Sequence, residues 1–274
     1  MKSNSTENIS LPLGEKKRAL SVVKIGGNVI ENSIELDKFL ALFSKIVGPK
    51  ILVHGGGKLA TQLANKLGIE SQLVNGRRIT DGESIDIITM VYGGLTNKTI
   101  VAKLQAYSCN AIGLSGADGN AIQAHKRPVK EIDYGFVGDI DGINAELIDS
   151  LLKVGLTPVF CALSHDGHGQ ILNTNADTIA SEIAIGMGEK YATTLYYCFE
   201  KKGVLLDIKD EYSVVTHINT VKYEELLDQK IIADGMLPKL ENCFHALHHN
   251  VHKVCLGDLE MIDEDAQLFT TITL

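Results

Sequence analysis

Two short apolar segments near the start of the chain each end in consecutive glycines and lead directly into a helical pattern. The segment ALSVVKI, which begins at Ala19, ends at Gly26 and Gly27, and the segment KILVH ends at the triple glycine 55–57. A strand, a glycine turn and a helix, repeated in tandem, are typical of a parallel sheet in an α/β protein. Glycines at such turns allow the backbone to come very close to a ligand or to a neighbouring loop.

The alternation of strands and helices continues along the chain. We expect, in order, a helix over 34–47 capped by Asn32 or Ser33, a helix opened by the capping-box spacing of Thr80 to Glu83, a β-ribbon over 121–140, a helix from Asn144 to Gly155, a buried strand over 157–164, strands at 192–199 and 203–207, a helix over 236–247, and strands at 251–258 and 269–274.

The composition fits one domain of this class. The 274 residues are 45% hydrophobic, and this length favours a single α/β domain with two lobes. Residues 1–18 are polar and contain Pro12 and Gly14, which predicts a flexible N-terminal arm before a domain over 19–274. The arm lacks an apolar signal segment, and no run of apolar residues is long enough to span a bilayer. We therefore expect a cytoplasmic protein without a membrane partner.

Charge and cysteine content narrow the classes of partner. The formal net charge of −8 disfavours nonspecific nucleic-acid binding, so we expect no nucleic-acid partner. The five cysteines are scattered and form no CxxC pair, which favours buried thiols in a reducing compartment. An anionic ligand must therefore be held by a few local cations and backbone amides.

Three kinds of local structure could use the triple glycine. A Walker phosphate loop is excluded, because the string GxxxxGK[ST] does not occur. The string HGGG from His54 matches the oxyanion motif of some esterases, but the nearest candidate for their GxSxG turn, GLSGA around Ser115, ends in the wrong residue. The third possibility is that the three glycines only form a tight turn and bind no ligand.

The second glycine turn favours an anion site. Lys24 stands two residues before Gly26 and Gly27, at the end of its predicted strand. In a doubly wound sheet, ligands bind outside the carboxyl ends of the strands, where both glycine turns lie. Amides from the two turns, together with the helix N-termini that follow, would form a cradle for an anion, and Lys24 would add a positive charge.

Several longer segments occur in a family-specific order. The strings VVKIGGNVI, ILVHGGGK, VNGRRITDGESIDIITMVYGGLTNKTIVAKL, GLSGADGN, ILNTNADTIASEIA and IIADGMLPKL follow one another from about Leu20 onward. The chain thereby resembles the N-acetylglutamate kinases of the amino-acid kinase family. The resemblance implies a three-layer αβα sandwich with a mostly parallel central sheet, in which an N-lobe of about 19–172 binds an acylated amino acid and a C-lobe of about 173–274 binds ATP.

The resemblance also implies a reaction. ATP would phosphorylate the side-chain carboxylate of N-acetyl-L-glutamate, or of a related N-acylglutamate, in arginine biosynthesis. The cofactors would be ATP and Mg²⁺, and the protein would be a homodimer or a larger homo-oligomer. No general base is required, because a glutamate carboxylate with a pKa near 4 is already ionised at neutral pH.

The matching positions give each site residue an expected role. Lys24 and Lys239 would contact the transferring phosphoryl group, and Asp177 would orient both lysines. The remaining roles are phosphate binding by Gly26 and Gly27, substrate binding by Gly56, Gly57, Arg78 and Asn173, and ATP binding by Lys202, Gly203, Ile232 and Ala233. Arg78 would hold the substrate α-carboxylate as a fork. Arg77 occupies a position that is often apolar in the family and receives no role.

Two features depart from a simple assignment. Where the family usually has a Thr/Ser–Asp pair, this chain has Cys198-Phe199-Glu200, so the ATP contacts of this segment stay open. The acyl group also stays open, with N-succinylglutamate, another amino-acid kinase activity and a non-catalytic amino-acid sensor as alternatives.

The spacing of His245, His248, His249 and His252 suggests a metal site, but we favour solvated or capping roles and predict no metal ligands.

Overall fold

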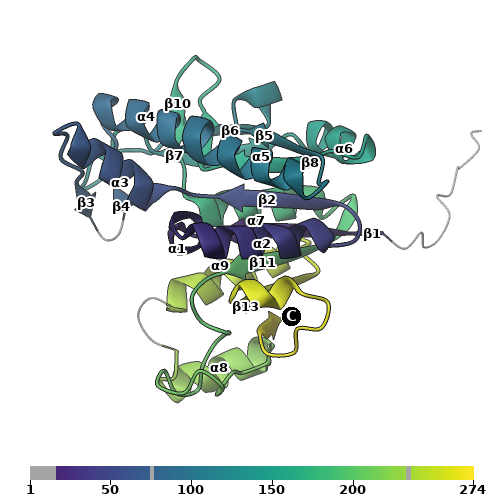
Figure 1. Ribbon diagram of the computed structural model, residues 1–274. Coiled ribbons are helices and arrows are strands. Elements are labelled where there is room, and N and C mark those ends of the chain that lie inside the picture. Colours follow the sequence, from purple (N-terminus) through teal and green to yellow (C-terminus); the bar gives the residue numbers. More distant parts are fainter. Residues whose placement is uncertain (1–16, 75–76, 233–235) are drawn as a thin grey trace, which may run out of the picture.

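A computed structural model describes residues 17–74, 77–232 and 236–274 of the protein. Its centre is an eight-stranded sheet with the order β12-β14-β13-β11-β1-β2-β8-β5 (Figure 1). The strands are β1 (Arg18–Ile25), β2 (Lys50–His54), β5 (Ala111–Leu114), β8 (Thr157–Cys161), β11 (Tyr191–Cys198), β12 (His217–Ile218), β13 (Lys253–Gly257) and β14 (Thr270–Ile272). Every neighbouring pair is parallel except β13 and β14, so the predicted mostly parallel sheet is confirmed.

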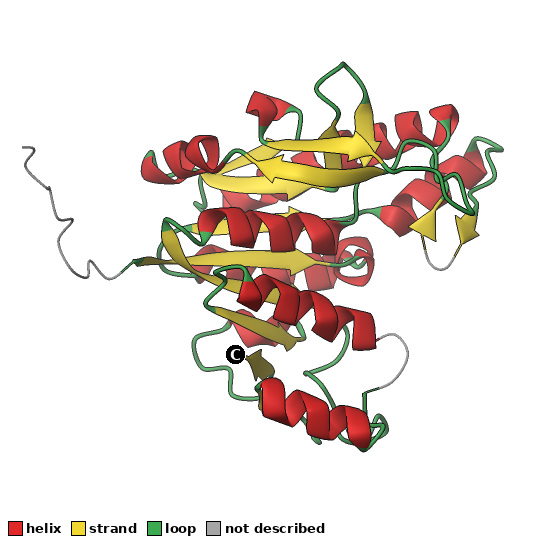
Figure 2. Ribbon diagram, turned by 180° about the vertical axis from the view of Figure 1, so that it is seen from behind, coloured by secondary structure: helices red, strands yellow, loops and turns green. Residues whose placement is uncertain are grey.

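Helices cover both faces of this sheet, as the opposite views of Figures 1 and 2 show. On β1, Val22 packs into one hydrophobic cluster and Val23 into another, because successive side chains of a strand point to opposite faces. One face is covered by α1 (Gly27–Glu31), α2 (Ser33–Lys45), α5 (Asn97–Ala106) and the 3₁₀ turn η4 (Leu259–Ile262), and the other by α6 (Ala145–Lys153), α7 (Ala176–Met187), α8 (Thr220–Asp228) and α9 (Leu237–His248). The three layers of the αβα sandwich are therefore present.

Smaller elements surround the carboxyl end of the sheet on the β5 side. They are a second sheet of β10 (Ile171–Asn173), β9 (Leu163–His165), β6 (Ile122–Lys126) and β7 (Gly138–Ile143), the hairpin of β3 (Leu73–Val74) and β4 (Arg77–Arg78), the helices α3 (Gly57–Lys66) and α4 (Gly82–Ile88), the π-helix η1 (Thr89–Thr96) and the 3₁₀ turn η2 (Asp118–Asn120). The predicted β-ribbon of 121–140 is confirmed as the antiparallel pair of β6 and β7.

Helix caps follow local side-chain chemistry. Asn32 caps α2 and Asn144 caps α6, each by accepting backbone N–H groups of the first turn, as predicted. The prediction of a capping box at Thr80 is wrong, because Asp81 caps α4 by accepting from the N–H of Ser84. Thr80 is instead buried, and its hydroxyl accepts from the side chain of Asn173.

One predicted strand is also wrong. Residues 203–207 form no strand of the sheet and make only an isolated bridge between Leu205 and Val214. The next strand toward the C-terminus is the short β12, which is followed by a helix, α8, that the sequence pattern did not suggest. The chain in this region turns on itself before it reaches the edge of the sheet.

The two predicted lobes share the central sheet. The strands β1, β2, β5 and β8 come from the first part of the chain and β11 to β14 from the second, and they meet where β1 pairs with β11. The predicted arm over 1–18 lies outside the described residues except for Lys17 and Arg18, and Arg18 already belongs to β1. None of the helices in the described ranges combines the length and apolar character that crossing a bilayer requires.

Candidate active site

Three charged side chains from different elements meet at the carboxyl edge of the central sheet. Lys24 lies near the end of β1, Asp177 in the first turn of α7, and Lys239 in the first turn of α9. The Nζ atom of Lys24 is 2.7 Å from Oδ1 of Asp177, and the Nζ atom of Lys239 is 3.7 Å from Oδ2. Each carboxylate oxygen therefore faces one ammonium group.

The environment of Asp177 keeps the carboxyl ionised. Burial acts to raise its pKa, but the positive charges of Lys24 and Lys239 outweigh burial, so the pKa lies below its ordinary value. The side chains of Lys24 and Asp177 are largely covered, with exposed fractions of 14% and 26%. A covered ion pair is screened less by water than a surface pair, so the arrangement holds both cations in place.

The two glycine turns lie side by side next to these charges. A Cβ atom on Gly27 would lie 3.8 Å from the side chain of Lys58, and the Lys58 ammonium donates to the side chain of Asn28. A Cβ atom on Gly26 would be 3.7 Å from Nζ of Lys24. The structure thus brings Gly26, a predicted phosphate-binding residue, to the predicted catalytic lysine.

The triple glycine is packed so closely that its middle residue has no room for a side chain. A Cβ atom on Gly56 would stand 2.8 Å from the ring of Tyr92, which belongs to the π-helix η1. Gly55 approaches Ala176, the neighbour of Asp177, since a Cβ atom there would be 3.8 Å from that of Ala176. Within the described residues, the N–H groups of Gly56 and Gly57 have no hydrogen-bond acceptor. They are available to an anion.

Arg78 is held against the same turn. Its guanidinium donates to the carbonyl of Gly57 at 3.0 Å and to the hydroxyls of Thr61 and Ser71. Asn173, at the end of β10, donates from Nδ2 to Oγ1 of Thr80 at 3.0 Å. Arg78 therefore lies at Gly57, as a shared ligand would require. Asn173 is connected to strand β4 through Thr80.

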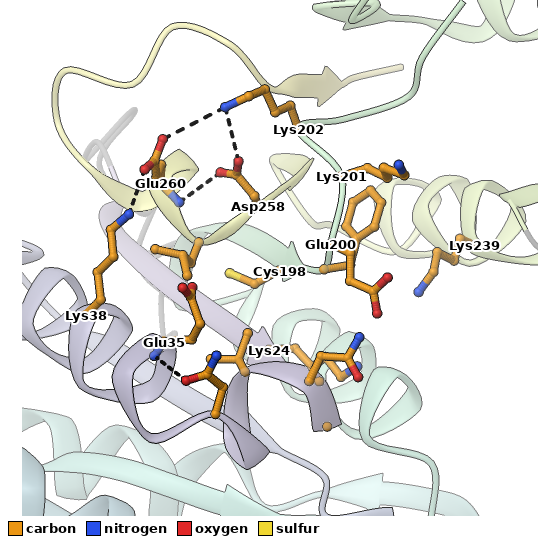
Figure 3. A pocket seen from close by; sticks show the side chains of 17 residues that line it. Lys24, Glu35, Lys38, Cys198, Glu200, Lys201, Lys202, Lys239, Asp258 and Glu260 are labelled. Atoms are coloured by element: carbon orange, nitrogen blue, oxygen red, sulfur yellow. Dashed lines mark hydrogen bonds and ion pairs between the residues drawn. The ribbon is translucent and has the colours of Figure 1, made fainter. Parts of the chain in front are cut away.

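A cleft of about 790 Å³ opens beside Lys24 and Lys239 (Figure 3). Lys202 lines it and lies 3.4 Å from Asp258 and 3.9 Å from Glu260, whereas Glu260 also pairs with Lys38 at 2.7 Å. Its size suits a nucleotide, because ligand pockets commonly measure about 300–1,000 Å³. The cleft also contains Cys198, Phe199 and Glu200, the segment that departs from the family pattern.

The other predicted ATP residues lie elsewhere. Gly203 is packed against Thr270 and Val214, where a Cβ atom would come within 2.5 Å of the Thr270 hydroxyl. Ile232 is 5% exposed and belongs to the hydrophobic core. Neither lines the cleft, and Ala233 lies outside the described residues. Of the three predicted ATP contacts that the structure describes, Lys202 alone lines the cleft.

The four histidines of the suggested metal site lie in the last turn of α9 and just beyond it. The helix ends at His248, and the ring of His249 donates from Nδ1 to the carbonyl of His245 at 2.7 Å. His252 lies beyond the helix, just before β13. Among the residues that the structure describes, no three His, Cys, Asp or Glu side chains are placed to hold a metal ion.

The sequence patterns assigned no role to the side chains that hold the predicted ligand-binding residues in place. Thr61 and Ser71 hold Arg78, Tyr92 closes over Gly56, and His54 donates to the carbonyl of Gly55. Only His54 carried a sequence signal, since it directly precedes the triple glycine. The others reach the site through the tertiary fold.

Paired cations, two glycine turns and an arginine at the carboxyl edge of a parallel αβα sandwich form an arrangement suited to anionic ligands. The chain belongs to the amino acid kinase family, whose family model matches residues 19–258. Among its relatives, the acetylglutamate kinase of Phocaeicola vulgatus is 52% identical over 248 residues, which are 90% of this chain and 96% of that protein. The acetylglutamate kinase of Methanopyrus kandleri is 36% identical over 88% of this chain and 96% of its own length.

A solved structure agrees with this fold. The carbamate kinase of Giardia lamblia bound to AMP-PNP superimposes with a TM-score of 0.68, covering 94% of this chain and 98% of that chain at 12% identity. At this identity the likeness concerns the fold alone. Membership of a kinase family implies that the chain uses ATP.

Proposed function

We propose that the protein transfers the γ-phosphoryl group of ATP to the side-chain carboxylate of N-acetyl-L-glutamate. The observation that carries this proposal is the bridge of Asp177 between Lys24 and Lys239, placed beside two glycine turns. The names of relatives about half identical over most of the chain support the choice of acceptor. Arginine biosynthesis is the corresponding metabolic role.

The reaction brings together two anions. A carboxylate oxygen of the acceptor attacks the γ-phosphorus, the bond from that phosphorus to the bridging oxygen breaks, and ADP leaves with the electron pair. Lys24 and Lys239 offset the negative charge on the oxygens during transfer, and the amides of Gly27, Gly56 and Gly57 donate to the same oxygens. No proton moves, because the acceptor carboxylate is already ionised at neutral pH.

Arg78 and Asn173 would hold the acceptor. The guanidinium of Arg78 is already fixed by three hydrogen bonds, so it can bind the α-carboxylate without losing further side-chain freedom. Asn173 would contact the acylated amino group. Mg²⁺ would neutralise the ATP phosphates and would be held largely by those phosphates and by water.

A coupled ADP-release assay tests this proposal. We expect ATP-dependent ADP release with N-acetyl-L-glutamate and little with free L-glutamate, because an unacylated amino group carries a positive charge toward the site. Strong activity on free glutamate would contradict the substrate assignment. Tight binding of N-acetyl-L-glutamate without any turnover would favour the sensor alternative.

A basic hollow next to β4 favours N-succinyl-L-glutamate as a second candidate acceptor. The lining of this hollow, of about 770 Å³, has the cations of Arg77, Arg127 and Lys130 and the carboxylates of Glu131 and Asp139. The carbonyl of Tyr134, which also lines it, accepts from the N–H of Thr80. Within the described part of the chain, Arg77 and Lys130 have no carboxylate partner, whereas Arg127 in the same hollow pairs with Asp139. An acyl group that ends in a carboxylate would match the free cations.

The same assay separates the two acceptors. If the hollow binds a succinyl carboxylate, Arg77→Leu lowers kcat/KM for N-succinyl-L-glutamate about tenfold, because one charge-assisted hydrogen bond is lost. The variant then leaves kcat/KM for the acetyl substrate within about twofold. No turnover of N-succinyl-L-glutamate by the wild-type protein, or an unchanged kcat/KM for it in Arg77→Leu, would remove the succinyl candidate.

Assembly and location complete the proposal. Family resemblance supports a homodimer or a larger homo-oligomer in the cytoplasm. Light scattering coupled to size-exclusion chromatography measures the mass directly, and a mass equal to one chain at micromolar concentration would contradict the assembly.

A further inference from the structure

Behind the triple glycine lies a buried chain of hydrogen bonds that the proposed reaction does not use. His54, the last residue of β2, is fully buried, and so is the side chain of Asn97 at the start of α5. Nδ1 of His54 is 2.8 Å from the carbonyl oxygen of Gly55, and Nε2 is 3.0 Å from Nδ2 of Asn97. The chain therefore connects the glycine turn to the interior of the fold.

Two neighbouring strands, β8 and β5, hold the far end of this series of hydrogen bonds. Nδ2 of Asn97 also donates to the carbonyl of Val159 in β8 at 2.9 Å, and Oδ1 of Asn97 accepts from the ammonium of Lys98. Lys98 donates in addition to the carbonyl of Gly113 in β5 at 3.0 Å. A Cβ atom on Gly113 would be 1.9 Å from Oδ1 of Asn97, so only glycine leaves room for the amide.

These partners determine the proton positions. The carbonyl of Gly55 can only accept, so Nδ1 of His54 must carry a proton. Both protons of the Asn97 amide are donated, one to Val159 and one to Nε2 of His54, so Nε2 must be the lone-pair nitrogen. Burial, together with the nearby charge of Lys98, lowers the pKa of His54 to about 4, so the ring is neutral at pH 7.

The carbonyl that His54 holds belongs to the peptide whose N–H is that of Gly56. The C=O and N–H of a trans peptide point in opposite directions. Holding the Gly55 oxygen toward the interior therefore turns the Gly56 N–H away from it, and this N–H has no acceptor among the described residues. Hydrogen bonds in such a series polarise one another, which strengthens the donor at the end of the series.

We propose that His54 is a positioning residue of the phosphoryl-transfer site, which fixes the Gly55 carbonyl through Nδ1 and thereby presents the N–H of Gly56 to the transferring group. The inference rests on the proposed kinase function. A merely structural histidine would stabilise the fold without a specific effect on turnover. A positioning histidine affects the step in which charge on the transferring oxygens is largest.

Two substitutions of equal shape separate these roles. In His54→Asn the side-chain amide nitrogen can occupy the place of Nδ1 and still donate to Gly55, whereas His54→Leu has similar branching and no donor. Both variants lose the ring nitrogen that accepts from Asn97, so the difference between them reports on the donor to the Gly55 carbonyl. We expect kcat of His54→Leu to fall about 10- to 100-fold with KM within about threefold, somewhat less than the loss of a complete oxyanion donor.

His54→Asn should restore kcat to within about threefold of the wild-type value. Equal kcat values for the Asn and Leu variants would overturn the proposal, as would a loss in His54→Leu that appears only in KM. Wild-type turnover is measured first, so that failure of the proposed kinase function is recognised separately.

A measurement on the wild-type protein is independent of turnover and of how the variants fold. Nitrogen NMR of protein labelled with ¹⁵N-histidine reports which ring nitrogen carries the proton. We expect a neutral His54 ring at pH 7 with its proton on Nδ1. A proton on Nε2, or on both nitrogens, would contradict the hydrogen-bond series and overturn the proposal.

Discussion

Asp177 is the residue on which the geometry of the candidate site depends most. Its two oxygens face Lys24 from β1 and Lys239 from α9, so one carboxylate joins both halves of the sheet. The resemblance placed all three residues in one site from sequence alone, because each lies in a segment of distinctive composition. The contacts of Arg78 with Thr61 and Ser71 could not be predicted, because they depend on the path of α3 and of the loop before β3.

Lys239→Ala tests the catalytic pair. We expect kcat to fall about 100- to 1,000-fold, because one of the two cations that offset charge in the transition state is lost. The dissociation constant for ATP, measured by calorimetry, should change much less, because other contacts bind the nucleotide. Lys201→Ala is the matched control, since Lys201 also lines the cleft but pairs with Glu211 at 3.8 Å. Unchanged turnover of Lys239→Ala would refute its role.

His54 also makes stability depend on pH. In the unfolded chain it binds a proton below its ordinary pKa of about 6.5, whereas the folded protein resists protonation down to about 4. The unfolded state therefore binds more protons between these values, and the free energy of unfolding falls by about 3 kcal/mol as the pH falls from 6.5 to 4. Urea unfolding at several pH values should show this slope reduced in His54→Asn; equal slopes would contradict the shifted pKa.

At the scale of elements, local chemistry predicted helix starts better than helix interiors. Asn32 and Asn144 were recognisable as caps because a short polar side chain preceded each apolar periodic segment. The π-helix at Thr89–Thr96 could not be foreseen, because its sequence satisfies a helical pattern and only tertiary packing widens the turn. The predicted strand at 203–207 failed because its backbone bonds to residues 213–215 rather than to a strand of the central sheet, although Val204 packs into the core.

The cap of α6 offers a test at this scale. Asn144 accepts from the N–H of Leu147 at 3.1 Å, so Asn144→Ala should lower the free energy of unfolding by about 1 kcal/mol. Ser150→Ala on the same helix is the control, because Ser150 only bonds to the carbonyl of Glu146 on an exposed surface. Urea titration measures both variants, and equal losses would contradict the capping role.

The order of strands is a property of the whole molecule that sequence patterns left undetermined. β1 lies between β2, its successor along the chain, and β11, which begins at Tyr191. Alternation of strands and helices predicts a parallel sheet but does not say which distant strand completes it. The family resemblance implied only that VVKIGGNVI and NTNAD contribute to one site, and the pairing of β1 with β11 is what brings these segments to the same edge.

Folding of the whole chain also controls its thiols. All five cysteines are buried, and burial raises the pKa of Cys161 to about 12 and that of Cys255 to about 11. Because the thiolate is the reactive form, we expect less than one thiol per chain to react promptly with Ellman's reagent in the native protein. In guanidinium, five should react. Rapid modification of the native protein would contradict this burial.

The carboxylate between the two lysines has a consequence for the enzyme at rest. Two ammonium groups gathered at one edge would repel each other in the absence of substrates, and a cavity containing them would tend to open or to lose a proton from one lysine. Asp177 removes that self-repulsion when the chain folds. The cost of assembling like charges is thus met before any reactant arrives, and the incoming phosphates find cations that are already aligned and need little rearrangement.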